Sequence, residues 1–160
     1  MVPKPPPPDT LPEFSAEERE RIALVQRFVR TAARKHGVDP QLVNGVIWVE
    51  SRFQPRARGN LGPRGLMQIM PRTARSLARE LGRRYQPYSA DFNIDAGTLY
   101  LAHMLEWFHG DASLALAAYN AGPATVRNAM EAGEALPERV QNYVHNVLVA
   151  ARVFAERGVR

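Results

Sequence analysis

A chain of 160 residues, 45% of them hydrophobic, is long enough for one globular domain with a buried core, and its composition gives no sign of a second. Because cysteine is absent, disulfides, thiolate nucleophiles and cysteine metal sites are excluded. The net charge of +5 favours a polyanionic partner, whether nucleic acid, an anionic lipid surface or an acidic cell-wall polymer, without selecting among them.

The first 14 residues are rich in proline and carry little hydrophobic pattern. We therefore expect a flexible arm at 1–14, to which an envelope, secretion-system or virion partner could attach, followed by one domain at 15–160. The arm lacks the apolar stretch of a signal peptide, and no later run approaches the roughly 20 apolar residues that span a bilayer. Neither a general export signal nor a transmembrane segment is expected.

Two helices are predicted at the start of the domain. Ser15 followed by Glu18 is a capping-box signature, and apolar residues then recur at helical spacing until a basic turn and a glycine end the helix. Asp39-Pro40 supplies an N-cap and a proline at the first position of a second helix, which ends near Ser51.

Five further helices are predicted downstream, separated by segments rich in glycine and proline. The segment 53–64 must form an irregular loop or a small hairpin, and 83–92 a loop. The helices are expected at 71–82, 93–110, 113–119 with Asp111 as N-cap, 123–132, and from about 138 onward. Because strand alternation is absent, the predicted fold class is mainly α with at most a vestigial β-hairpin.

Glu50 is the first candidate for chemistry. It ends an apolar helical run, with Val46 and Ile47 one turn behind it on the same face. Burial there, together with the negative end of the helix dipole, would raise the pKa of the carboxyl and keep it protonated, as a general acid requires. The alternative is a half-exposed glutamate that pairs with Arg52 or Arg56.

Other kinds of catalytic site are weakly indicated. Ser51 lies in no nucleophile elbow, so a hydrogen-bonding role is favoured. Neither a metal nor another cofactor is expected, because the histidines have no helical i, i+4 pairing and no acidic partner at ligand spacing, and we expect them on the surface. They are His36, His103, His109 and His145. The scattered arginines lack the aromatic interleaving of a nucleic-acid groove, so no nucleic acid is expected as partner.

Several acids could supply a second carboxylate, although most sit at expected helix starts where capping explains them. They are Asp91, Asp95, Glu106, Asp111 and Glu138. Gln68, alone among apolar residues, could bridge buried backbone or point a donor into a cleft. Tyr119, at a tight helix corner, is expected to place its hydroxyl on a backbone carbonyl, and Tyr143 invites the same interpretation.

Taken together, these segments resemble the soluble lytic transglycosylase catalytic domain in order and spacing, over about residues 25–155. The matching segments are Glu50-Ser51, 65–71, Asn93-Ile94 with Gly97, 118–123 and Tyr143-Val144. The resemblance implies a helical fold similar to goose-type lysozyme, glycan strands of peptidoglycan as substrate, and Glu50 as the catalytic residue. It also implies substrate-binding roles, which fall on Ser51, Gln68, Met70, Ala118, Tyr119, Asn120 and Tyr143.

Relatives in that family cleave between N-acetylmuramic acid and N-acetylglucosamine without water and leave a 1,6-anhydromuramic acid end. The resemblance therefore places the protein in the cell envelope. Two alternatives are a hydrolytic muramidase, with a water activated by Asp91, Asp95 or another acid, and a non-catalytic peptidoglycan-binding or assembly module. One position departs from the family pattern: Arg139 stands where many relatives have a glutamate, and Glu138 is one place away.

Overall fold

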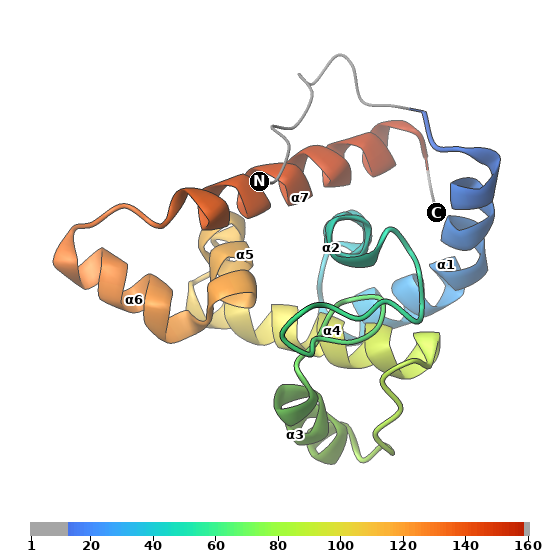
Figure 1. Cartoon of the computed structure of the whole chain (residues 1–160), viewed down its shortest axis with the longest axis horizontal. Helices are drawn as coiled ribbons and strands as arrows, with labels where there is room; N and C mark the ends of the chain where they lie inside the picture. The colour runs from blue at the N-terminus through green and yellow to red at the C-terminus, as the bar shows by residue number, and fades with distance from the viewer. Residues whose placement is uncertain (1–12, 159–160) are drawn as a thin grey trace.

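The computed structural model describes residues 13–158, which fold into helices joined by loops (Figure 1). Within this range the helices are α1 (Ala16–His36), α2 (Pro40–Ser51), α3 (Pro71–Leu81), α4 (Ala90–Trp107), α5 (Ala112–Ala121), α6 (Pro123–Ala132) and α7 (Glu138–Glu156). The segment between α2 and α3 has only the isolated antiparallel bridges Arg58–Arg64 and Arg64–Ile69 in place of strands. The prediction of a mainly helical fold with at most a vestigial hairpin is confirmed.

The capping residues identified in the sequence begin three of these helices. Ser15 and Glu18 form the reciprocal capping box of α1, and the Asp39 and Asp111 carboxylates accept N–H bonds at the starts of α2 and α5. The predicted start of α4 was wrong. Ser89 is its N-cap, so the helix begins three residues before Asn93.

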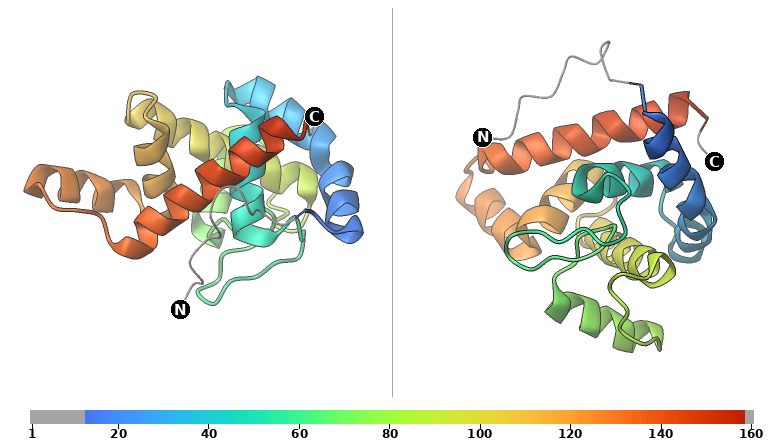
Figure 2. Two further views of the ribbon diagram at one scale, coloured as in Figure 1. Left: turned by 90° about the horizontal axis from the view of Figure 1, so that it is seen from above. Right: turned by 45° about the vertical axis from the view of Figure 1, so that its right-hand side comes forward.

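Helices α2 and α7 cross closely, and this crossing positions the site. Figure 1 shows α2 between α7 and α4, and the view from above in Figure 2 places α7 over α2. Gly45 allows the crossing, because a Cβ at this position would lie 2.7 Å from the Val147 carbonyl oxygen. The buried residues Val43, Val46 and Ile47 carry α2 through the core.

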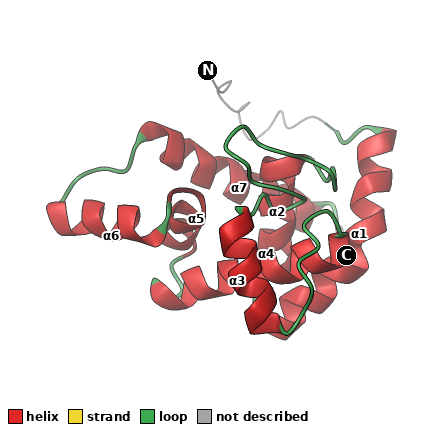
Figure 3. Ribbon diagram, turned by 60° about the horizontal axis from the view of Figure 1, so that its bottom comes forward, coloured by secondary structure: helices red, strands yellow, loops and turns green. Residues whose placement is uncertain are grey.

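The segment 52–70 crosses α2 and α4 before it enters α3 (Figures 1 and 3). Asn93 of α4 fastens it: the side-chain amide donates to the carbonyl oxygens of Arg64 and Pro87, each at 3.0 Å, and its oxygen accepts from Met67 N at 2.7 Å. With an exposed fraction of 1%, this amide satisfies backbone groups that water cannot reach.

The arm predicted at 1–14 lies mostly outside the described residues. Phe14, the last residue of that predicted arm, is buried and stacks on Phe154 of α7 at a ring-centroid distance of 5.2 Å.

A buried ionic cluster joins α1 to α4. Asp95 contacts Lys35 Nζ at 3.0 Å, His36 Nε2 at 2.7 Å and Arg83 Nη1 at 2.9 Å. The prediction that His36 lies on the surface was wrong, since its side chain is only 8% exposed. Asp95 likewise lies inside α4, beyond its first turn, so capping does not explain it.

No helix in residues 13–158 combines the length and the apolarity needed to cross a bilayer. Within the same range, no three histidine or acidic side chains gather closely enough to hold a metal ion.

Candidate active site

A cleft of about 570 Å³ opens beside the C-terminal end of α2. Its walls come from α2, the segment 60–70, the first turn of α3, α4, the corner between α5 and α6, and the start of α7. Of the site residues predicted from the sequence, it brings together Glu50, Gln68, Met70, Tyr119 and Asn120. The other predicted residues are buried behind this wall: Ser51, Ala118 and Tyr143.

Glu50 faces the cleft from the last turn of α2. The Tyr143 hydroxyl donates to Glu50 Oε1 at 2.8 Å, not to a backbone carbonyl as its sequence position alone suggested, and this bond joins α7 to α2. Burial raises the pKa of Glu50 from 4.5 to about 7, and the Tyr143 hydrogen bond acts in the opposite direction. The carboxyl is therefore substantially protonated at neutral pH.

The alternative for Glu50, an ion pair with Arg52 or Arg56, is not found among the described residues, where Tyr143 is its hydrogen-bond partner. Arg52 lies over the Trp48 ring at 4.2 Å and contacts Glu18 Oε1 at 3.7 Å. Burial and the neighbouring Glu50 raise the pKa of Tyr143 well above 10, so its phenol keeps the proton that it donates. Glu50 thus has a neutral donor as its partner.

Ser51 fastens the end of α2 to the next segment. Its hydroxyl lies 2.7 Å from the Leu66 carbonyl oxygen and 3.0 Å from that of Ile47. This is a contact with backbone, made next to the acid. Ala118, the residue before Tyr119 in α5, has no exposed surface and belongs to the apolar core.

Gln68 follows the first of the two alternatives drawn from the sequence, the bridging of backbone. Its amide Nε2 donates to the carbonyl oxygens of Ala57 at 3.0 Å and Gly65 at 2.9 Å, so the residue lines the cleft without pointing a free N–H donor into it. It adopts the left-handed conformation, with φ of 48°, which is unusual for a residue other than glycine. Met70, 44% exposed, stands on the rim at the N-cap of α3.

The corner between α5 and α6 forms the opposite wall. As predicted, the Tyr119 hydroxyl lies on a backbone carbonyl, that of Met67 at 2.7 Å, and this bond ties α5 to the Gln68 segment. Asn120 Oδ1 accepts from Arg139 Nη1 at 3.2 Å. Tyr100 also lines the cleft, and sequence reasoning missed it because it lies in a strongly apolar helix that reads as core.

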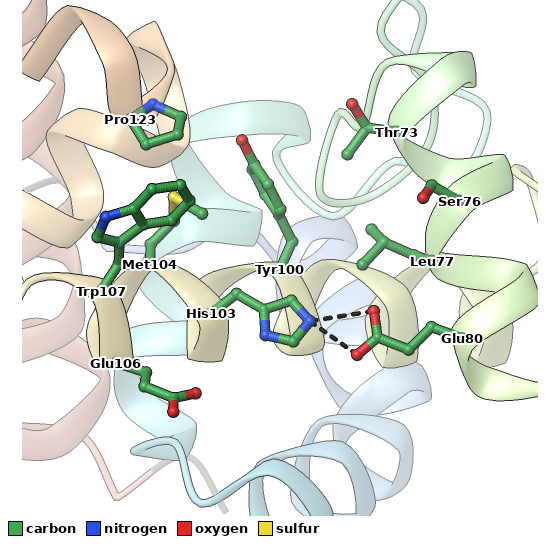
Figure 4. Close-up of a pocket in the computed structure, with 10 residues that line it drawn as sticks. All are labelled: Thr73, Ser76, Leu77, Glu80, Tyr100, His103, Met104, Glu106, Trp107 and Pro123. Atoms are coloured by element: carbon green, nitrogen blue, oxygen red, sulfur yellow. Dashed lines mark hydrogen bonds and ion pairs between the residues drawn. The ribbon is translucent and has the colours of Figure 1, made fainter.

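A second hollow of about 520 Å³ adjoins the cleft, and the two share Thr73 and Tyr100. Figure 4 shows α3 and α4 facing each other across it, with Tyr100 and Trp107 on α4. His103 of α4 bonds to Glu80 of α3 at 2.9 Å across its edge. The two cavities therefore border each other at Thr73 and Tyr100.

The candidate second carboxylates lie elsewhere. Asp91 and Asp95 bind Arg83, Asp111 caps α5, and Glu106 lines the second hollow. Glu138, in the first turn of α7, is exposed and is not part of the cleft wall. Among the described residues that line the cleft, Glu50 is thus the only carboxyl group.

A buried acid with a pKa of about 7, facing a cleft in a helical domain, is suited to give a proton to a glycosidic oxygen, as the general acid of a lysozyme-like domain does. The comparison of the sequence with family models makes this specific. The model of the transglycosylase SLT domain matches residues 27–142, and the chain belongs to this family.

Individual relatives agree with this assignment. The chain is 38% identical over 112 residues to membrane-bound lytic murein transglycosylase C of Actinobacillus pleuropneumoniae serotype 5b (strain L20), a match that covers 62% of this chain and 31% of the relative. It is 33% identical over 129 residues to the peptidoglycan transglycosylase gp16 of Escherichia phage T7, covering 76% of this chain and 10% of that protein.

Solved structures confirm the predicted lysozyme-like fold. The lytic transglycosylase Slt of Pseudomonas aeruginosa superposes with a TM-score of 0.76 at 30% identity, over 82% of this chain and 24% of that one. The 70 kDa soluble lytic transglycosylase of Escherichia coli gives 0.76 at 25% identity, with the same coverages of 82% and 24%. The chain thus spans less than a third of the length of each relative.

Proposed function

We propose that this domain is a peptidoglycan lytic transglycosylase with Glu50 as its catalytic residue. It cleaves the β-1,4 bond between N-acetylmuramic acid and N-acetylglucosamine and leaves a 1,6-anhydromuramic acid end. The observation that carries the proposal is that no other carboxyl group lines the cleft among the described residues, while burial raises the pKa of Glu50 to about 7. A lone acid favours a reaction in which the same group serves first as acid and then as base.

In the proposed mechanism, protonated Glu50 gives its proton to the glycosidic oxygen as the bond to C1 breaks and an oxocarbenium-like centre develops. The Glu50 carboxylate then removes the proton from the muramic acid 6-hydroxyl, and that oxygen closes on C1. Glu50 recovers its proton, and no water enters the product. Intramolecular attack is favoured because well-oriented groups reach effective molarities on the order of 10⁵ M or more.

The neighbouring residues support this use of Glu50. Tyr143 donates to Oε1 at 2.8 Å and stabilises the carboxylate that forms after proton transfer. We propose that Gln68, Met70 and Asn120 contact the glycan from the cleft wall. Tyr119 holds that wall through its bond to the Met67 carbonyl oxygen.

Two buried residues, Ser51 and Ala118, complete the set of substrate-binding residues predicted from the sequence, and we propose that they act by supporting the cleft wall. Ser51 contributes through its bond to the Leu66 carbonyl oxygen, which keeps the end of α2 against the cleft segment. Ala118 contributes by close packing behind that wall.

Product mass tests the reaction. Digested peptidoglycan is separated and weighed, because the anhydro product is lighter by one water than the product of a hydrolytic muramidase. We expect the anhydro form. The hydrated form as the main product would instead identify a muramidase on the same scaffold.

Glu50→Gln tests the residue. It keeps the shape of the side chain and removes the proton cycle, so the variant should stay folded, bind glycan and lose cleavage. Glu131→Gln, an exposed site on α6 outside the cleft, is the matched control and should cleave normally. Substantial residual cleavage by the Glu50 variant would refute the assignment.

This proposal places the site of action in the cell envelope, where glycan strands of peptidoglycan are found. The names of the similar proteins of Actinobacillus pleuropneumoniae and of phage T7 agree, since each names murein or peptidoglycan. We keep the proline-rich segment 1–14 as the proposed attachment point for an envelope, secretion-system or virion partner.

A further inference from the structure

Arg139 brings a positive charge into the wall of the cleft. It lies four residues before Tyr143 in the first turns of α7, so the two side chains share one face of the helix. Tyr143 reaches the Glu50 carboxyl, and Arg139 lines the same cavity. The helix that holds the acid therefore also presents a cation to whatever occupies the cleft.

The Arg139 guanidinium has no counter-charge in the part of the chain that the structure describes. Its contact is with the Asn120 side-chain oxygen, at 3.2 Å from Nη1, and it forms no ion pair there. A guanidinium carries five N–H donors, so most of them remain available to a ligand. Glu50 lines the same cavity, but burial raises its pKa to about 7, so it is only about half ionised at neutral pH, and it forms no ion pair with Arg139 among the described residues.

A carboxylate is the ligand that this arrangement fits. The planar guanidinium fork binds carboxylates with two parallel hydrogen bonds, and Asn120 holds one of its nitrogens in place. N-acetylmuramic acid differs from N-acetylglucosamine by a lactyl group that ends in a carboxyl. That carboxyl is free in peptide-stripped strands and is replaced by the carboxylates of the stem peptide in intact ones.

We propose that Arg139 binds a substrate carboxylate, from the lactyl group or from the stem peptide, and so makes the cleft select muramic acid strands over neutral N-acetylglucosamine polymers. This inference rests on the proposed function of the cleft. It assigns to α7 two tasks, holding the acid through Tyr143 and recognising substrate charge through Arg139.

Binding to the inactive Glu50→Gln protein tests the inference, with and without Arg139→Gln. Three ligands of equal sugar length are titrated calorimetrically: an N-acetylglucosamine oligomer, a peptide-free muramic acid oligomer and the same oligomer carrying stem peptides. Loss of a charge-assisted contact should weaken binding of a carboxylate-bearing ligand about tenfold or more and leave the neutral oligomer unchanged. Arg139→Lys should fall between, because it keeps the charge and loses the fork.

The ligands separate the two sources of the carboxylate. A loss with the peptide-free oligomer assigns the contact to the lactyl group, and a loss only with the peptide-bearing oligomer assigns it to the stem peptide. Arg152→Gln removes the same charge from an exposed site farther along α7, outside the cleft, and should change none of the affinities.

Two results would overturn the inference alone. Equal weakening for all three ligands would show that Arg139 only supports the cleft through Asn120, and no weakening for either carboxylate-bearing ligand would remove its role. If Glu50→Gln with Arg139 intact binds none of the oligomers, the proposed function fails as well. Unfolding midpoints of the Arg139 and Arg152 variants show whether each remains folded.

Discussion

The burial that suits Glu50 for its proposed role as an acid also makes the fold less stable when the carboxyl ionises. The α2 helix carries it out of the apolar core, and burial favours its neutral form until the pH approaches 7. An unfolded chain would ionise the same group near 4.5. The proposed catalytic role of Glu50 and the stability of the fold therefore depend on the same protonation equilibrium.

This linkage predicts a pH-dependent stability. Because the folded-state pKa is raised, the favourable contribution is present in full below pH 4.5 and is lost as the pH rises to about 7. The loss amounts to at most about 3 kcal/mol. The Glu50→Gln variant has no carboxyl to ionise and so escapes this loss. Its stability relative to wild type should therefore be greater at pH 8 than at pH 5. Urea unfolding at the two pH values measures the gain, and an equal difference at both would contradict the raised pKa.

Tyr143→Phe should move the pH profile of cleavage. The Tyr143 hydrogen bond lowers the pKa of Glu50, so its removal should raise that pKa further. With protonated Glu50 as the active form, the alkaline limb of the rate profile should shift upward by about 0.5–1 unit. The rate itself should fall, because the carboxylate formed in the reaction loses a donor. A lower rate with an unshifted limb would mean that the phenol only fills space.

At the scale of elements, the site depends on the close crossing of α2 and α7. Tyr143 and Glu50 meet because Gly45, further back on α2, lets the Val147 backbone approach. The hydrogen bond at the site and the packing behind it are therefore one arrangement.

Gly45→Ala tests this dependence. The added methyl would meet the Val147 carbonyl oxygen at 2.7 Å, and this is backbone that cannot rotate away. We expect a loss of about 1–3 kcal/mol of unfolding free energy and a marked fall in cleavage as the helices separate. Gly133→Ala, at the C-cap of α6 with a φ of 64° and open space around it, is the control: it should cost stability through its backbone while cleavage persists. Unchanged stability in the Gly45 variant would refute the crossing argument.

Local signals in the sequence predict the elements well, and contacts between distant segments account for what they miss. The caps at Ser15, Asp39 and Asp111 act within four residues, so the sequence shows them directly. Tyr143 and Glu50 are 93 positions apart, and no local pattern pairs them. Only the family resemblance predicted that Tyr143 belongs to the site.

The errors have the same origin. His36 and Asp95 are 59 positions apart in the sequence, so no local pattern pairs them. His36 was therefore predicted to be a surface residue and Asp95 a capping residue. Tyr100 faces the cleft from a helix whose apolar pattern predicts only burial. Arg139 was visible in the sequence as a departure from the family, and its place in the cleft required the fold.

At the scale of the whole molecule, the Asp95 cluster adds charged contacts between parts of the chain that also share the apolar core. Lys35 and His36 end α1, Asp95 lies in α4, and Arg83 follows α3. The same α4 carries Asn93, which fastens the cleft segment through Met67 N. The cluster thus supports the helix on which one wall of the site depends.

Asp95→Asn should therefore destabilise the whole domain. It leaves three cationic or polar partners facing a buried amide, and breaking such a pair costs about 3 kcal/mol or more. Burial acts to raise the pKa of Asp95, but hydrogen bonds from His36, Arg83 and Lys35 lower it below 3.8. Its contribution is present above pH 3.8 and is lost as the pH falls through the lower folded-state pKa, so the gap between wild type and variant should close in acid.

Asp91→Asn provides the matched control for this loss. Asp91 binds the same Arg83 at 2.9 Å, but its side chain is 57% exposed, against 8% for Asp95. Exposed pairs contribute less than about 1 kcal/mol, so the control should unfold close to wild type in urea at pH 7. If the two variants lose the same stability, the shared arginine rather than the burial of Asp95 holds α4 in place.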